Sequence, residues 1–315
     1  MLNGYIEEKR AVGYKFDKGA SLLKEFDNLL IREGFNGEIL TQEIVLLWTE
    51  KRKIEADNTR NARISLIKGL AQYMTRLGHK SYIYPDKSVS IDRHKYTPYI
   101  FAENELANLF DAADNLPSSP VSPFRRQIFS LLFRMLYGCG LRASEASNLK
   151  TMDVNLKDGT LFIHHTKLDK ERIVPMDLAL VKKCKKYQES VLKNNLDNPY
   201  FFPSPCGGSF GRKTIYSIFR KILWQAGISH GGRGRGPRVH DFRHTHTVHC
   251  LKKWVLNGND ITALMPYLSA YLGHSDLRGT EYYLKLTADL YPTIVSKVDS
   301  SFSSLIPEVG SYERD

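Results

Sequence analysis

The chain has 315 residues, 42% of them hydrophobic, which is long enough for two domains with separate cores and is not the composition of a disordered protein. Its 45 lysines and arginines exceed its 34 acidic residues and give a net charge of +11, which favours a polyanionic partner such as nucleic acid. The four cysteines have no CxxC spacing, which disfavours a disulfide framework or a cysteine zinc site. No apolar run reaches the length of a membrane span, so we expect a cytoplasmic protein without a membrane partner.

The first 84 residues have the apolar periodicity of helices. The spacing predicts one long amphipathic helix over residues 5–34, a second that begins at Thr41, and a third over residues 59–78. Arg60 and Arg63 lie on the polar face of the third helix and are candidate contacts to nucleic-acid phosphates. A solvated helix face is the other explanation of these charges. Residues 1–84 are thus expected to form a small helical domain.

A polar, basic stretch without apolar periodicity, residues 85–98, is predicted to be an interdomain linker. The second domain is expected to span residues 99–315. Its segment 125–137 is apolar on nearly every face, so this helix should be the buried centre. The periodicity then changes to that of strands at 160–165 and 172–175, which predicts a hairpin. The expected fold class is mainly α, with a small β-sheet or hairpin in the second domain.

Arg142 and Glu145 follow two glycines at the predicted start of a helix. Residues three apart on a helix are neighbours, so the carboxylate can orient the guanidinium. A surface ion pair of little energetic value is the ordinary explanation of such a pair. A helix start also favours anions, and this favours phosphate binding by Arg142.

Two cationic loops are further candidates for phosphate contacts. Lys167 lies at the rim of the predicted hairpin, where a flexible ammonium group could reach a neighbouring site or simply be solvated. The glycine-rich stretch 231–238 carries Arg233, Arg235 and Arg238, which suit a nucleic-acid backbone but are also compatible with an ordinary disordered loop.

His240 and Arg243 lie one helical turn apart, so both can reach one anion. His240 and His244 are four residues apart and raise the alternative of a zinc site. That alternative lacks the glutamate of an HExxH motif, and a metal there would displace Arg243 from an anion. The roles of His244, His246 and His249 stay open at this point.

The ordered set of these motifs resembles the tyrosine recombinase, or phage-integrase-type, family over nearly the whole chain. The resemblance is carried by residues 140–145, 166–172, 240–245 and 272–275, which are similar to the arginine, lysine, HxxR and second histidine motifs of the family. The family's nucleophile lies nine residues after the histidine of the last motif, which selects Tyr283 over Tyr282. Without the resemblance, His274 and both tyrosines would be explained as structural or core residues.

The resemblance implies DNA cleavage by the Tyr283 phenol, which forms a 3′-phosphotyrosine and releases a 5′-hydroxyl. The site residues and roles that it implies are Arg142 and Arg243 as clamps on the phosphate, His240 as general base and later acid, Lys167 as acid for the leaving oxygen, His274 as a further donor, and Glu145 as support for Arg142. It implies no metal, nucleotide or other cofactor.

The resemblance also implies a two-domain clamp around duplex DNA that carries specific recombination sites. A C-terminal segment between Leu290 and Ile306 would dock on a neighbouring protomer, which gives a homo-tetramer on two DNA sites, with accessory proteins as further partners. The expected process is integration, excision or transposition of a mobile element. A type IB topoisomerase-like enzyme and a non-catalytic DNA-binding regulator on the same fold are the two alternatives, with a zinc hydrolase behind them.

Overall fold

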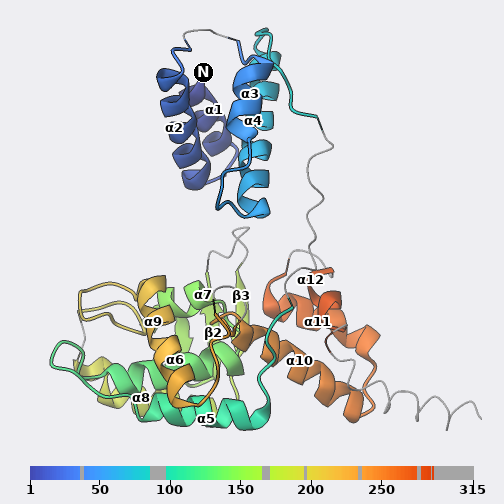
Figure 1. Cartoon of the computed structure of the whole chain (residues 1–315). Coiled ribbons are helices and arrows are strands. Elements are labelled where there is room, and N and C mark those ends of the chain that lie inside the picture. The colour runs from blue at the N-terminus through green and yellow to red at the C-terminus, as the bar shows by residue number, and fades with distance from the viewer. Residues whose placement is uncertain are drawn as a thin grey trace, which may run out of the picture. The chain divides into compact units, whose positions relative to one another are not determined.

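The structure is a computed structural model that describes residues 1–35, 39–85, 97–164, 171–194, 197–232, 236–274, 278–284 and 286. The chain divides into two compact units, Met1–Thr97 and Pro98–Asp315, and each is described by itself (Figure 1). Lys167, Arg233, Arg235 and the C-terminal segment between Leu290 and Ile306 lie outside the described residues. Within the described residues, no helix is long and apolar enough to cross a bilayer.

The first unit consists of helices. They are α1 (Leu2–Ala11), α2 (Asp17–Arg32), α3 (Gln42–Thr49) and α4 (Asp57–Arg76). The prediction of one helix over residues 5–34 is wrong, because Gly13 (φ 89°) and Phe16 (φ 53°) take left-handed conformations that separate α1 from α2. Thr41 caps α3 as expected, since its hydroxyl accepts a hydrogen bond from the Ile44 amide at 3.4 Å. The apolar faces of the helices bury one core around Phe26.

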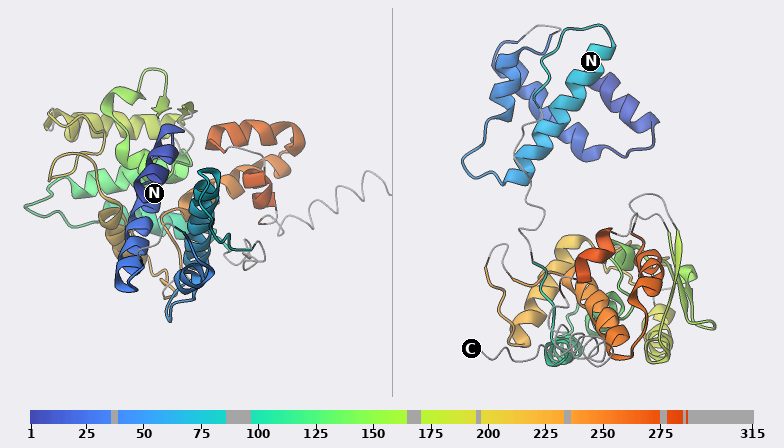
Figure 2. Two further views of the ribbon diagram at one scale, coloured as in Figure 1. Left: turned by 90° about the horizontal axis from the view of Figure 1, so that it is seen from above. Right: turned by 90° about the vertical axis from the view of Figure 1, so that its right-hand side faces the viewer.

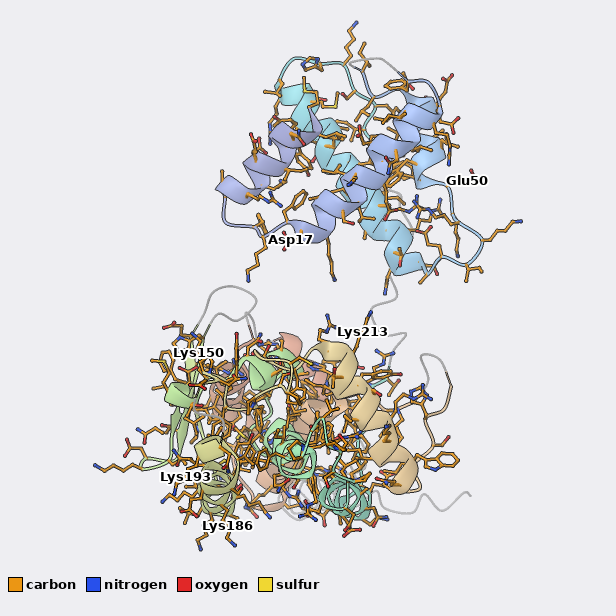
Figure 3. All side chains as sticks on the ribbon, turned by 90° about the vertical axis from the view of Figure 1, so that its left-hand side faces the viewer. Asp17, Glu50, Lys150, Lys186, Lys193 and Lys213 are labelled. Carbon is orange, nitrogen blue, oxygen red and sulfur yellow. The ribbon has the colours of Figure 1, made fainter. Side chains whose placement is uncertain are left out.

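The second unit is built around α6 (Arg125–Gly138), as predicted from its sequence. Seven apolar side chains that cover its surface are buried, and α6 contacts α5 (Glu103–Asp114), α7 (Ala143–Asn148), α8 (Leu178–Ser190) and α10 (Asp241–Leu256). The short turns η1 (Thr151–Asp153) and η2 (Leu192–Asn194) and the helix α9 (Arg212–Gln225) complete this part. The lysines of α8 are exposed around the buried Cys184, and Figure 3 shows Lys186 pointing outward.

A small antiparallel sheet lies at one edge of the second unit. Its strands, in the order β1-β2-β3, are β1 (Val154–Asn155), β2 (Thr160–Ile163) and β3 (Arg172–Pro175). The predicted hairpin is confirmed by the pairing of β2 with β3, in which Leu161 lies opposite Val174. The two-residue strand β1 is too short to give a periodic signal and was not predicted.

The helices α10, α11 (Ile261–Leu272) and α12 (Arg278–Glu281) gather at one end of the second unit (Figures 1 and 2). They bury a separate apolar cluster that includes Val248, Leu251 and Leu268. Tyr283 belongs to this cluster. The helix α11 also contacts β3, the second strand of the hairpin, and Arg172 of β3 donates a hydrogen bond to the Tyr271 carbonyl near the C-terminal end of α11.

Candidate active site

The site is organised around the C-terminal end of α11. Three successive carbonyls there each accept a hydrogen bond from a different arginine, and the pairs are Tyr271 O with Arg172 Nε at 2.8 Å, Leu272 O with Arg243 Nη2, and Gly273 O with Arg142 Nη2 at 3.1 Å. The last carbonyls of a helix lack partners within the helix and carry the negative end of its dipole. This helix end therefore draws three guanidinium groups from distant parts of the chain together.

Gly273 makes this arrangement possible. It has φ +66°, a left-handed conformation that ends α11 and that a residue with a side chain rarely adopts. A Cβ atom added at Gly273 would also lie 3.0 Å from Arg172 Nη1, so the arginine packs directly against the glycine. The glycine thus serves both the turn and the close approach of Arg172.

Arg142, Glu145 and Arg172 form one charged group. Arg142 is the residue before the first turn of α7, and its Nη1 lies 2.6 Å from Glu145 Oε1, as the spacing of the two residues predicts. Arg172 adds a bidentate contact that was not predicted, with Nη2 at 2.8 Å from Oε2 and Nη1 at 3.1 Å from Oε1. Burial opposes ionisation of Glu145, but the two arginines outweigh it and lower its pKa to about 2. The carboxylate is therefore ionised at neutral pH.

Arg243 is almost fully buried, with 1% of its surface exposed. Its Nη1 donates to the carbonyl of Gly140 at 2.8 Å, and its Nη2 donates to the Leu272 carbonyl. Burial, and next the charge of Arg142, lower the pKa of Arg243 to about 10. Arg243 therefore keeps its charge at neutral pH, in a surrounding of low polarity that strengthens its action on an anion.

His240 stands at the N-terminal end of α10, one turn before Arg243. His240 is exposed to solvent at the surface of the second unit. The surrounding protein and the charges of Arg243 and Arg142 still lower its pKa to about 4. A neutral imidazole at this place can accept a proton at neutral pH.

His274 follows Gly273 directly and is oriented by Thr280. The ring Nδ1 lies 2.8 Å from the Thr280 hydroxyl, which is fully buried. The ring of His274 is parallel to that of Tyr283, at an interplanar angle of 3° and a centroid distance of 6.4 Å. The segment that carries the tyrosine thus also fixes the histidine.

Tyr283 is buried, with 3% of its surface exposed, in the apolar cluster of α10 and α11. Its hydroxyl lies 2.7 Å from Nδ1 of His244. Burial raises the pKa of Tyr283, and the charge of Arg243 offsets part of this increase. Burial, and next the charges of His240 and Arg243, lower the pKa of His244 to about 3, so its ring is neutral at neutral pH in this contact.

Of the other candidate phosphate contacts, Arg63 is buried inside the first unit and not exposed on a polar helix face as predicted. Its side chain is 2% exposed and pairs with Glu55, with Nε at 2.8 Å from Oε1, while its Nη1 donates to the Trp48 carbonyl. The prediction that Arg63 contacts a phosphate is wrong, because its guanidinium is buried and hydrogen bonded to groups of the first unit. Arg60 is partly buried and donates to the Thr49 carbonyl at 2.9 Å. Arg238 is exposed.

The zinc alternative has no candidate ligand set in the part of the chain that the structure describes, since no group of three His, Cys, Asp or Glu residues there could hold a metal ion. The rings of His240 and His244 lie 4.7 Å apart and nearly perpendicular. The structure places His246 against Tyr271, with stacked rings, and His249 within 3.0 Å of the Tyr137 hydroxyl.

Residues 100–289 match the sequence model of the phage integrase family. The chain belongs to this family. Among its relatives, the putative integrase/recombinase y4rB of Sinorhizobium fredii is 27% identical over 94% of this chain and 95% of its own length. The tyrosine recombinase XerC of Oceanobacillus iheyensis is 27% identical over 90% of this chain and 88% of its own length.

Two solved structures of integrases have the same fold. The Tn1549 transposon integrase in complex with transposon right end DNA is 14% identical, with a TM-score of 0.63, over 90% of this chain and 93% of that chain. A lambda integrase tetramer bound to a Holliday junction is 16% identical, with a TM-score of 0.60, over 87% of this chain and 76% of that chain. The mainly helical fold with a small sheet is thereby confirmed.

Sequence reasoning missed two contributors to this site. Arg172 was part of the hairpin motif but received no role, because its partner Glu145 is 27 residues away and no local pattern connects them. Thr280, which orients His274, gave no signal. The role of His244 was left open, although its position one turn after His240 placed it on the same helical face.

Proposed function

We propose that this protein is a site-specific DNA recombinase that cleaves and rejoins duplex DNA through a 3′-phosphotyrosine at Tyr283. The observation that carries the proposal is the convergence of Arg142, Arg243, His240 and His274 on the site that holds Tyr283. Hydrogen bonds across 131, 103 and 39 residues of sequence join these segments. Membership of the phage integrase family supports the same reaction.

In this proposal, Arg142 and Arg243 hold the non-bridging oxygens of the scissile phosphate. Each guanidinium is already anchored on the end of α11, so its orientation does not have to be formed during the reaction. The planar fork of an arginine suits two phosphate oxygens at once. His274, oriented by Thr280, donates a further hydrogen bond to the phosphate.

The chemical step transfers the phosphoryl group from a DNA oxygen to the tyrosine. The Tyr283 oxygen attacks phosphorus and loses its proton to the neutral His240, while the bond to the 5′-oxygen breaks. Lys167 protonates the leaving 5′-oxygen, which yields a 5′-hydroxyl and the 3′-phosphotyrosine. Attack by the 5′-hydroxyl of another strand reverses these steps, so no metal, nucleotide or external energy source is required.

The partner is duplex DNA with recombination sites. A net charge of +11 favours its phosphates, and Arg60, Arg233, Arg235 and Arg238 are the proposed backbone contacts in addition to the catalytic set. We also propose that residues 1–84 are a DNA-binding domain joined through 85–98 to the catalytic domain 99–315. Both domains close on DNA as a clamp.

We further propose a homo-tetramer on two DNA sites, in which the segment between Leu290 and Ile306 docks on a neighbouring protomer. The lambda integrase tetramer on a Holliday junction, which shares the fold, supports this assembly. The fold shared with a transposon integrase supports integration, excision or transposition of a mobile element, in the cytoplasm and with accessory proteins.

The test starts from a library of nicked duplexes with randomised arms. A nick next to the cleavage site releases a short fragment on cleavage, so the covalent complex is trapped and survives denaturation. DNA recovered from the covalent fraction defines a cleavable duplex. We expect the wild type and Tyr282→Phe to form the complex and Tyr283→Phe to form none.

A complex that persists in Tyr283→Phe would contradict the proposal. Two selected sites on one plasmid then separate the related activities. Exchange between the sites is expected, whereas relaxation of supercoils without exchange would indicate the topoisomerase-like alternative.

A further inference from the structure

Arg172 is a third arginine at the candidate active site, beside Arg142 and Arg243. It is the first residue of β3, and its side chain is 8% exposed. It bridges two elements that are far from it in sequence, Glu145 on α7 and the Tyr271 carbonyl at the end of α11, which is 99 residues away. Its guanidinium thus joins strand β3 to both elements that hold Arg142.

The carboxylate of Glu145 is shared between Arg142 and Arg172. Oε1 accepts from Arg142 Nη1 at 2.6 Å and from Arg172 Nη1 at 3.1 Å. Oε2 accepts from the backbone amide of Arg142 at 2.9 Å and from Arg172 Nη2 at 2.8 Å. Each carboxylate oxygen is therefore fixed by both residues, and the plane of the carboxylate cannot turn without loss of contacts to Arg172.

This sharing has an electrostatic consequence. Arg142 and Glu145 alone would form a neutral pair, and a neutral pair attracts a phosphate weakly. With Arg172 the group carries one net positive charge, so Arg142 is oriented by a carboxylate without losing its attraction for an anion. Loss of Arg172 would leave Glu145 buried with one partner and would draw Arg142 toward the carboxylate.

We propose that Arg172 is a positioning residue for phosphate activation, which acts through Glu145 and the α11 end to set the orientation and effective charge of Arg142. The inference rests on the proposed function. Exposure distinguishes the two arginines, since 26% of the Arg142 side chain is exposed against 8% of Arg172. Arg142 is accordingly the one that contacts the phosphate, and Arg172 acts behind it.

The test compares cleavage rates of Arg172→Met on two forms of the selected nicked duplex. One carries the normal phosphodiester, and the other carries a methylphosphonate, in which a neutral methyl group replaces one non-bridging oxygen. The methylphosphonate develops less negative charge and needs less help from Arg142. We expect Arg172→Met to slow cleavage of the phosphodiester about 10- to 100-fold, as misplacement of a catalytic group does. On the methylphosphonate we expect a loss at least fivefold smaller.

The matched control is Arg134→Met. Arg134 makes a comparable bidentate contact with Asp114 in the same unit, with both N···O distances 2.7 Å, but it lies outside the site. We expect Arg134→Met to change cleavage of both duplexes less than about threefold. Arg172→Lys should resemble Arg172→Met, because one ammonium group cannot make the two parallel contacts with Glu145.

Equal slowing on the two duplexes would overturn the inference, because a general structural defect does not distinguish them. So would rates equal to those of Arg134→Met. If Arg172→Met does not fold, as judged by its thermal melt, Arg172→Lys is held to the same criteria. A wild type that cleaves neither duplex, or cleavage that survives in Tyr283→Phe, would instead refute the proposed function itself.

Discussion

The Tyr283 hydroxyl lies 2.7 Å from Nδ1 of His244, so the proposed nucleophile is hydrogen bonded within its own domain. Burial raises the pKa of Tyr283, so the phenol is protonated at neutral pH in this contact, in the protein without DNA. In the proposed reaction, the tyrosine hydroxyl leaves His244 to reach the phosphate and loses its proton as it attacks. The position of Tyr283 in the protein without DNA therefore differs from the position from which it would attack the phosphate.

We predict that Tyr283 is protected from nitration by tetranitromethane in the protein without DNA, because only 3% of it is exposed and nitration needs the phenolate. His244→Ala removes a hydrogen bond worth about 1 kcal/mol, which should raise the nitration rate of Tyr283 roughly fivefold. Peptide mapping of nitrated tyrosines gives the rates. His230→Ala is the control, since His230 makes a similar contact at 3.0 Å with the exposed Tyr216. Unchanged nitration in His244→Ala would contradict the role given to this contact.

Stability should decrease in mild acid because of the histidines of α10. The pKa is lowered to about 4 in His240 and His246 and to about 3 in His244, and it is also lowered in His249. In the unfolded chain these groups take up protons below about pH 6.5, whereas the folded chain takes them up only near its lower pKa values. The free energy of unfolding should therefore fall as the pH falls from 6.5 toward 4.

Urea titrations between pH 7.5 and 5 measure this dependence. The pKa of His164 is raised by its contacts with Glu171 and Asp153, so this group adds to stability as the pH falls. It is a single histidine, whereas four histidines have lowered pKa values, so we expect their effect to dominate. His246→Gln should make the dependence less steep than in the wild type. Stability that rises as the pH falls from 6.5 to 5 would refute this prediction.

Arg142→Lys should impair cleavage although it keeps the charge. A lysine cannot contact Glu145, the Gly273 carbonyl and a phosphate with one planar group, as Arg142 is placed to do. We expect the cleavage rate of the selected duplex to fall by about 100-fold, the usual effect of losing one preorganised donor. Affinity for the duplex, measured by fluorescence anisotropy, should change little. A normal cleavage rate would exclude Arg142 as a phosphate clamp.

Arg63 should matter for the stability of the first unit. Its pair with Glu55 is buried, with side-chain exposures of 2% and 3%, so Arg63→Met leaves an uncompensated carboxylate in the interior. We expect a loss of about 3–5 kcal/mol in the free energy of unfolding of this unit, and a smaller loss in the double variant Arg63→Met/Glu55→Gln. Urea unfolding followed by tryptophan fluorescence reports it through Trp48. Arg60→Met, which removes a more exposed group, should cost far less.

The features that sequence predicts well are those with a local cause. The segment that forms α6 is apolar on nearly every face, which predicts a buried helix. The strands β2 and β3 have the alternating pattern of a hairpin. The pair Arg142 and Glu145 shares one helical turn, so its contact could be expected as well. The left-handed residues Gly13 and Phe16 interrupt a continuous apolar pattern, and for this reason the break between α1 and α2 was missed.

The features that were missed depend on tertiary structure. Arg172 reaches Glu145 only because β3 packs beside the end of α11. Arg63 looked like a solvated charge because the residues that bury it, Trp48 and Glu55, come from α3 and the loop after it. Charge on a helix face does not by itself distinguish an exposed arginine from one that is paired in the interior.

The proposed cleavage reaction depends most on Tyr283 as its nucleophile. The direct measurement is mass spectrometry of the peptide that stays attached to the selected nicked duplex after protease and nuclease digestion. The proposal predicts a single nucleotide-bearing residue, Tyr283, linked to the 3′-phosphate of the cleaved strand. Attachment at Tyr282, or to a 5′-phosphate, would contradict it.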